Sequence, residues 1–350
     1  MPAMMKKVLL GTAPITIGSL SWRRPIVVAV VTAALTAFAI WYGEPAMAFP
    51  LAIGSLFTGI GGIGEAPGHR WRIMLWTGLW VGLAAILGGF MSNVGVAELA
   101  VVALVAAACG FAGTLGPRGV LVGVLTLVTY AIYAGTPDTG IGSLESGALV
   151  GLGALIQMAA LLIPVLLRNR QLLRGREDDL PSMRARIRAH AQRRDDFARH
   201  GARLAVAMVI ASAIGHTSDW PHQYWIPMTV AWLSRPDTSG MATRVLSRVA
   251  GTILGTALAI VIIDGLGISG YGLAIAVGLG SLVAVVYLAV DYTIAVAGIT
   301  VIVMALLSLL GEPIAETAPS RIASTLVAAV IVVLASAALP STSARHAVFG

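Results

Sequence analysis

Two arginines one helical turn apart are the residues of this sequence best suited to binding a ligand. Arg244 and Arg248 are four positions apart, so on a helix they lie on the same side. Arginine binds carboxylates through two parallel hydrogen bonds, and the pair could therefore hold an organic anion. Arginines near the end of a membrane helix also anchor it on the cytoplasmic side. The spacing alone leaves both functions open.

Other ionisable residues could bind protons or metals. Asp291 interrupts two apolar runs, which suits either a proton-coupling carboxylate at the cytoplasmic mouth or a turn between two helices. His216, Asp219 and His222 are close in sequence but lack the spacing of a metal site, and pH sensing is the alternative. Nucleotide-binding loops, Ser/His/Asp arrangements and zinc motifs are not visible, so we expect no catalytic site, no cofactor and no metal.

The chain around these residues is too apolar for a soluble protein. Of its 350 residues 57% are hydrophobic and 11% are charged, whereas soluble domains carry about 25% charged residues. A membrane helix needs roughly 20 apolar residues to cross the bilayer. The sequence predicts an all-α integral membrane protein of about twelve transmembrane helices, from apolar runs at about 25–42, 46–63, 73–92, 96–114, 118–135, 146–167, 203–217, 224–234, 246–264, 270–290, 292–310 and 322–339. The run 224–234 is short, which suits either a broken helix at a transport site or an ordinary tilted helix.

The basic residues predict the orientation in the membrane. With the N-terminus in the cytoplasm and twelve crossings, 22 of the 23 Lys and Arg residues fall on the cytoplasmic side, and only Arg321 does not. Both termini are then cytoplasmic. The basic linker 168–202 is either a topology determinant or a contact for anionic lipid headgroups. The acidic residues expected on the outward side are Glu44, Glu98, Asp138, Glu145, Asp219, Asp264, Glu312 and Glu316.

The two halves of the sequence repeat one another at a shift of about 176 residues. The matched positions are Gly135 with Gly311, Pro137 with Pro313, Pro164 with Pro340, Pro50 with Pro227, and the pair Gly78 and Gly82 with Gly251 and Gly255. Glycines four apart let helices pack closely, so we expect these four glycines to be packing positions, with Gly251 and Gly255 at the interface between the repeats. An even number of spans in each half predicts parallel repeats around a pseudo-two-fold axis along the membrane normal. The predicted segments are a cytoplasmic N-terminus (1–24), a first six-helix repeat (25–167), the linker (168–202), a second six-helix repeat (203–340) and a cytoplasmic tail (341–350).

One segment of the second half, residues 224–255, resembles a known family. It contains Tyr224-Trp225-Ile226-Pro227-Met228-Thr229, then Arg235-Pro236-Asp237, then Arg244-x3-Arg248-x2-Gly251-Thr252-x2-Gly255. The pattern is similar to that of the fusaric acid resistance family of bacterial membrane proteins. This family includes aromatic-acid exporters and is distantly similar to plant aluminium-activated malate channels. Two features depart from it: Arg235 stands where the family usually has glutamine, and the linker 168–202 replaces a large cytoplasmic domain.

The resemblance implies a transporter of the bacterial inner membrane that exports small organic anions, among them aromatic carboxylic acids, with the proton gradient as the energy source. It implies Thr229, Arg235, Asp237, Arg244 and Arg248 as substrate-binding residues, and it does not suggest an enzyme. An anion channel with a pore between the halves and a non-transporting membrane scaffold are the alternatives. The expected partners are the organic anion and the lipid bilayer, and a homo-oligomer stays open. The net charge of +7 reflects the cytoplasmic arginines, so we expect no nucleic-acid partner.

Overall fold

Helices make up all the regular secondary structure that the computed structural model describes, in residues 22–63, 67–92, 94–136, 142–168, 182–193, 196–217, 220–237 and 240–339. The predicted all-α class is therefore confirmed. The α-helices are α2 (Arg23–Tyr42), α3 (Ala48–Gly61), α4 (Pro67–Met91), α5 (Glu98–Phe111), α6 (Pro117–Ala134), α7 (Ser143–Arg168), α8 (Met183–Arg193), α9 (Asp196–Thr217), α10 (Trp225–Leu233), α11 (Met241–Ala259), α12 (Tyr271–Tyr287), α13 (Tyr292–Leu309) and α14 (Ile314–Ala338). Short segments η2 (Pro45–Met47), η3 (Gly95–Ala97), η4 (Ala112–Leu115) and η6 (Ile260–Gly265) adjoin them.

Nine helices of the described residues are long and apolar enough to cross a membrane. Their outer faces carry large apolar side chains, such as Trp41 and Leu104, each 72% exposed. Water would not solvate such a surface, and lipid would. The protein is thus a multi-pass membrane protein with nine candidate spans.

Three of the twelve predicted runs give helices that are shorter than a span. Pro45–Gly61 and Tyr271–Tyr287 are apolar but fall below the length of the other nine, and α10 has nine residues. The chain becomes extended at Ser234, two residues before Pro236, which keeps α10 short. Helix length and composition therefore support nine spans, and the predicted count of twelve is not established by them.

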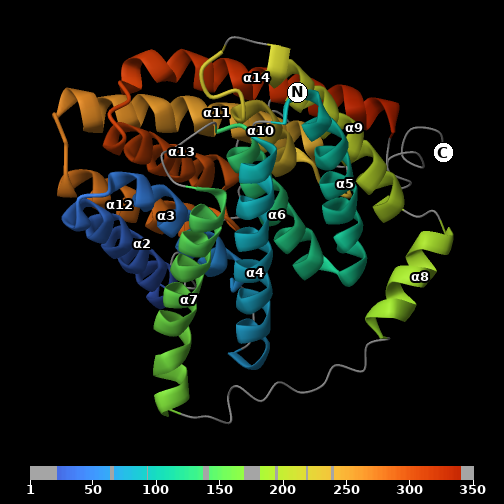
Figure 1. Ribbon diagram of the computed structural model, residues 1–350, viewed down its shortest axis with the longest axis horizontal. Helices are drawn as coiled ribbons and strands as arrows, with labels where there is room; N and C mark the ends of the chain where they lie inside the picture. Colours follow the sequence, from blue (N-terminus) through green and yellow to red (C-terminus); the bar gives the residue numbers. More distant parts are fainter. Residues whose placement is uncertain are drawn as a thin grey trace, which may run out of the picture.

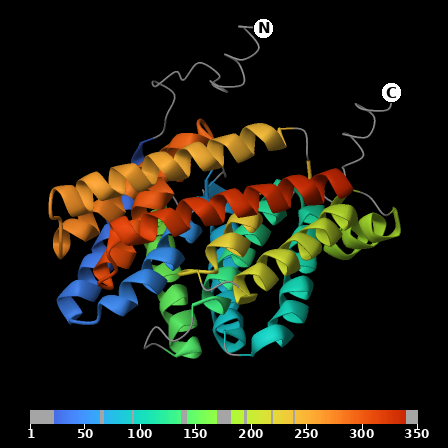
Figure 2. The same ribbon diagram turned by 90° about the horizontal axis from the view of Figure 1, so that it is seen from above.

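The same pairs of helices pack together in the two halves of the chain. Helices α3 and α4 both pack on α7, as α10 and α11 both pack on α14, and α4 packs on α6 as α11 packs on α13. Between the halves, α5 packs against α9 and α2 packs against α12. In Figure 1, α4 and α7 run down the view while α11 and α14 run along its long axis, and Figure 2 shows α11 and α14 both lying across the molecule, with the chain running in opposite directions along them.

Gly251 and Gly255 bring α11 against α13. A Cβ atom on Gly255 would lie 2.5 Å from the carbonyl oxygen of Ala297 and 2.7 Å from Cβ of Thr300, and one on Gly251 would collide with the carbonyl oxygen of Thr293. Both helices belong to the second half. The prediction that these glycines lie between the two repeats is therefore wrong, because their face of α11 is covered by a helix of the same half.

The corresponding glycines of the first half lie on α4. A Cβ atom on Gly78 would come within 2.8 Å of Cβ of Ala154 on α7, whereas one on Gly82 would make an ordinary contact at 3.5 Å with the carbonyl oxygen of Gly147. The two glycine pairs thus face different partner helices, α7 in the first half and α13 in the second. The glycine pairs therefore do not make equivalent contacts in the two halves, since α13 corresponds to α6 and not to α7.

Candidate functional site

The residues implied by the family resemblance lie on α10, on α11 and in the turn between them. Arg244 is half-buried, and its Nη2 donates a hydrogen bond to the backbone carbonyl of Asp237 at 2.8 Å. Arg235 is half-buried and Asp237 is exposed. Thr229 and Arg248, by contrast, are fully buried. The structure thus separates the predicted set into a group at the turn, around Arg244, and a group in the protein interior, around Arg248.

A further arginine, Arg203 on α9, holds the turn in place. Its Nη1 donates to the carbonyl of Leu339 at 2.9 Å, and its Nη2 donates to the carbonyl of Arg235 at 2.6 Å. The side chain of His200 lies 3.2 Å from the same Nη2. Arg203 therefore fixes the start of α9, the turn after α10 and the end of α14 relative to one another.

Arg248 on α11 and Arg321 on α14 are both fully buried and have no hydrogen-bond partner. Each is 0% exposed, and none of the three guanidinium nitrogens of either residue has an acceptor. The two are close enough for the charge of Arg248 to act on Arg321. Two unpaired positive charges thus share the interior between α11 and α14.

Buried hydroxyl groups without partners lie on the same helices as these arginines and on α10. Arg248, Thr252 and Thr256 follow one another at four-residue spacing along one face of α11, and neither threonine hydroxyl has a partner. Thr229 on α10 and Ser324 on α14 are also buried with unpartnered hydroxyls. These residues are buried on three helices that pack on one another, α10, α11 and α14. We call them the arginine core: Arg248, Arg321, Thr229, Thr252, Thr256 and Ser324.

Such a core is costly unless a negative charge enters it. A buried ion without a partner costs several kcal/mol even after relaxation, and two like charges add mutual repulsion. An anion would give both guanidinium groups acceptors and would cancel part of the charge. The chemistry of the arginine core therefore fits a carboxylate or another small anion.

The polar core at α2, α3 and α7 is built differently. Ser55 donates to Oε1 of Gln157 at 2.8 Å, and the hydroxyl groups of Thr32 and Ser55 are 3.0 Å apart. This cluster is uncharged, and its hydroxyl groups bond one another. It needs no ligand to satisfy them, in contrast to the arginine core.

An aromatic group covers Arg321. The Arg321 guanidinium lies 5.0 Å from the centroid of the Trp225 ring, a distance typical of a cation–π interaction. The imidazole of His222 stacks on the same indole at 4.5 Å, and His222 Nε2 is 2.8 Å from a carboxylate oxygen of Glu312. Trp225 thus joins the arginine core to the turn before α10.

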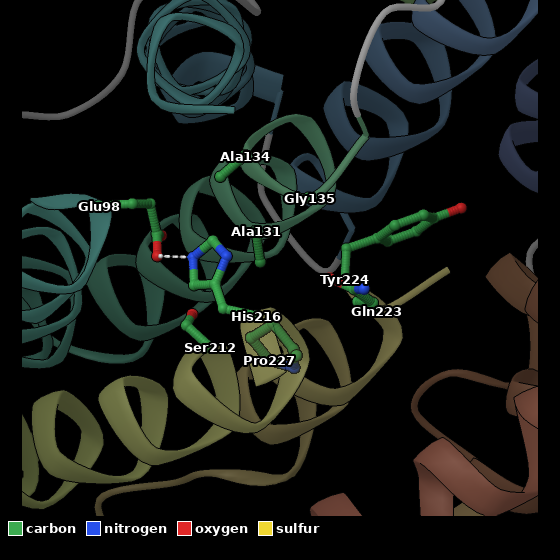
Figure 3. Close-up of a pocket in the computed structure, with 10 residues that line it drawn as sticks. Glu98, Ala131, Ala134, Gly135, Ser212, His216, Gln223, Tyr224 and Pro227 are labelled. Carbon is green, nitrogen blue, oxygen red and sulfur yellow. Dashed lines mark hydrogen bonds and ion pairs between the residues drawn. The ribbon is translucent and has the colours of Figure 1, made fainter. Parts of the chain in front are cut away.

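A small pocket lies beside this turn, between α5, α6, α9 and α10. Figure 3 shows Glu98 reaching toward His216 across it, with Tyr224 and Pro227 on the other side. Glu98 accepts a hydrogen bond from the hydroxyl of Tyr130 at 3.1 Å, and His216 Nε2 lies 3.3 Å from its other oxygen. The pocket therefore holds a buried carboxylate between a tyrosine and a histidine.

Asp291 lies in the turn between α12 and α13, as one of its two interpretations predicted. Its Oδ1 accepts hydrogen bonds from the backbone N–H groups of Thr293 at 2.8 Å and Ile294 at 3.2 Å, which makes it the N-cap of α13. The carboxylate thus satisfies helix-end donors. A role in proton coupling stays a prediction.

Sequence reasoning missed Arg321, Glu98 and Arg203. Arg321 was the exception to the basic-residue pattern, and the signal that could have identified it is the polar stripe of Thr317, Arg321 and Ser324 on one face of α14. Glu98 and Arg203 carried no such signal, because their partners lie between 32 and 136 residues away in the sequence, apart from the contact of Arg203 with His200.

Comparisons with known proteins give one family and one relative. Residues 206–335 match the family described as fusaric acid resistance protein-like. An uncharacterized protein of Synechocystis sp. is 35% identical over 57 residues, a match that covers 16% of this chain and 8% of the relative. No solved structure matches. The family match contains α10, α11 and Arg321, and so the whole arginine core. Residues 206–335 of this membrane protein are thus a fusaric acid resistance protein-like domain.

Proposed function

We propose that the protein exports small organic anions, among them aromatic carboxylic acids, and that the carboxylate binds between Arg248 and Arg321. The observation that carries this proposal is the complete burial of both guanidinium groups without a hydrogen-bond acceptor. A carboxylate has two oxygens and accepts the paired N–H groups of arginine. The hydroxyl groups of Thr229, Thr252 and Ser324 can donate to the same anion.

Arg235, Asp237 and Arg244 form the approach to this site in our proposal. Arg244 precedes Arg248 by one helical turn and is only half-buried, so an anion held first at Arg244 needs to move about one turn, roughly 6 Å, to reach Arg248. Arg203 keeps this mouth in place through its bond to the carbonyl of Arg235. The mouth lies on the cytoplasmic side in the proposed orientation, where an exporter collects its substrate.

We also propose that the chain forms two parallel six-helix repeats with twelve spans, in the inner membrane of a bacterium, with both termini cytoplasmic. The matched packing of α3, α4, α6 and α7 with α10, α11, α13 and α14 supports the repeats. Helices related by a two-fold axis along the membrane normal make equal angles with that normal. Because α4 and α7 differ in direction from α11 and α14 (Figure 1), all four are tilted in the bilayer in this arrangement. Membrane helices are tilted by about 20° on average, within a range of about 0–40°.

The energy source in this proposal is the proton gradient. The sequence has no nucleotide-binding loop, so export against a concentration gradient needs an ion gradient or a partner. An anion channel would instead conduct at equal pH on both sides. The two mechanisms are thus separated by whether a pH gradient concentrates the anion.

The experiment is benzoate transport into proteoliposomes that contain the purified protein, with and without a pH gradient. Arg248→Lys and Arg321→Lys keep the charge but lose the planar fork. We expect each to reduce the transport efficiency by roughly 10- to 100-fold, because a hydrogen bond to a charged group contributes about 1.5–3 kcal/mol. Arg184→Lys, at an exposed position of α8, is the matched control. Wild-type transport in both core variants, or no benzoate transport by the wild type, would overturn the proposal.

A further inference from the structure

Glu98 is a buried carboxylate that the anion site does not use. It is the first residue of α5 and only 3% exposed. Its oxygens contact the hydroxyl of Tyr130 and Nε2 of His216, and the His216 side chain is 31% exposed. A buried acid bonded to an imidazole that water can reach is well placed to take up and release a proton.

This pair links the two halves of the chain. Glu98 belongs to α5 in the first half, His216 lies near the end of α9 in the second half, and these two helices pack together. The halves also meet where α2 packs against α12 and where α6 packs against α10, and none of these four helices contains an aspartate, glutamate or histidine. A movement that separates α5 from α9 therefore breaks the Glu98–His216 contact and exposes Glu98, whereas the α2–α12 and α6–α10 contacts contain no such acid–imidazole pair.

One aromatic layer separates this pair from the arginine core. Tyr224 lines the pocket that contains Glu98 and His216. Its ring meets Trp225 edge-on at 6.0 Å, and Trp225 lies under Arg321 at 5.0 Å. A change in the α5–α9 contact can thus reach Arg321 through Tyr224 and Trp225.

From this arrangement we infer that Glu98 and His216 together form the proton-binding site that couples the proton gradient to anion export. The inference rests on the proposed function. In this inference the pair binds one proton from the outer side when the α5–α9 contact opens, and it loses that proton toward the cytoplasm for each anion that moves outward.

Other ionisable groups face the pair, and they define the controls. Tyr130 approaches from α6, Tyr224 from the turn before α10, and Arg321 lies behind Trp225. The nearby acid–imidazole pair, His222 with Glu312, lies wholly within the second half. It cannot sense separation of the halves, so Glu312→Gln is the matched control for Glu98→Gln. Asp219 lies outside the described residues.

The test compares two assays of benzoate in proteoliposomes. Accumulation driven by a pH gradient, beyond that of protein-free liposomes in which neutral benzoic acid diffuses, requires the coupling proton, whereas exchange of internal for external benzoate at equal pH does not. We expect Glu98→Gln to lose gradient-driven accumulation and the accompanying proton flux, and to keep wild-type exchange. We expect His216→Asn to shift the pH profile of accumulation, and Glu312→Gln and Asp291→Asn to keep gradient-driven accumulation.

Several outcomes would overturn the inference. One is gradient-driven accumulation by Glu98→Gln at the wild-type level. Another is loss of both accumulation and exchange in a Glu98→Gln protein that is folded. If Glu98→Gln does not fold, Glu98→Asp replaces it: a shifted pH profile supports the site, and an unchanged profile contradicts it. Absence of exchange in the wild type would instead contradict the proposed function, so the two failures are distinguishable.

Discussion

Arg321 and Trp225 are in contact inside the protein, with Cζ of Arg321 5.0 Å from the centroid of the indole ring. Both side chains are fully buried. The imidazole that stacks on the same indole belongs to His222, whose φ of 57° is unusual for a residue other than glycine. Strained backbone of this kind persists where the surrounding structure demands it. The turn before α10 is thus shaped to keep Trp225 against Arg321.

Replacing Trp225 should weaken anion transport. Trp225→Leu removes the aromatic face that stabilises Arg321, and a buried cation–π interaction contributes about 0.5–2 kcal/mol. We expect the KM for benzoate to rise by roughly 2- to 30-fold, with a smaller rise in Trp225→Phe, which keeps an aromatic ring. Trp41→Leu, at a position that is 72% exposed, serves as the control. Equal KM values in the Leu and Phe variants of Trp225 would show that an aromatic ring face against Arg321 does not contribute to anion binding.

A single methyl group at Gly255 should destabilise the protein. The new Cβ of Gly255→Ala would lie 2.5 Å from the carbonyl oxygen of Ala297, and overpacking of this kind costs about 1–3 kcal/mol. Gly151→Ala is a matched control, because a Cβ at this helical glycine of α7 meets no atom within 4 Å. We expect the control to be neutral or slightly stabilising, since helical glycine costs about 0.5–1 kcal/mol relative to alanine. Thermal unfolding in detergent measures both, and equal melting temperatures would refute a close α11–α13 contact.

Loss of Arg203 should loosen the cytoplasmic mouth before it unfolds the helices. Arg203→Met removes the hydrogen bonds to the carbonyls of Arg235 and Leu339 and keeps most of the side-chain volume. We expect faster amide hydrogen exchange in the Arg235–Asp237 turn and at the end of α14. Arg188→Met, at an exposed position of α8, should leave exchange unchanged. Equal protection of these amides from exchange in the Arg203→Met variant and the wild type would show that Arg203 does not hold the turn and the end of α14 in place.

The orientation can be tested with single cysteines in a Cys109→Ala background. Ser182 precedes α8 and Ser269 lies in the turn before α12, and both are exposed. In intact cells we expect an impermeant thiol reagent to label Ser269→Cys and not Ser182→Cys. Permeabilised cells provide the control, where both should react. Labelling of Ser182→Cys in intact cells would reverse the proposed orientation.

The sequence predicted the helices better than their ends. Apolar runs identified every described helix except α8 as a membrane segment, because burial in lipid demands apolar side chains on all faces. The start of α9 was placed at residue 203, whereas the helix begins at Asp196. The predicted second repeat starts at Arg203, directly after the basic linker. Backbone carbonyls of distant segments satisfy this arginine, and no local pattern reports such partners.

The candidate site was predicted in part. Arg248 and Thr229 were identified through the family motif, and both lie in the arginine core. Arg321 appears in the sequence analysis only as an exception to the orientation rule. That rule counts basic residues by loop and does not use the helix face on which a residue lies. Its partners Arg248 and Trp225 lie 73 and 96 positions earlier, and only the fold brings them together.

The difference between the two polar cores determines how many anions one chain can hold. The cluster of Thr32, Ser55 and Gln157 is uncharged and bonds internally, with only Nε2 of Gln157 left without a partner. Arg248 and Arg321 are the two described arginines whose three guanidinium nitrogens are all buried without an acceptor. We therefore expect the protein to bind one anion, at the arginine core of the second half, although its helix packing is duplicated. Calorimetric titration should saturate at one anion per polypeptide, with a hyperbolic isotherm and a Hill coefficient of one.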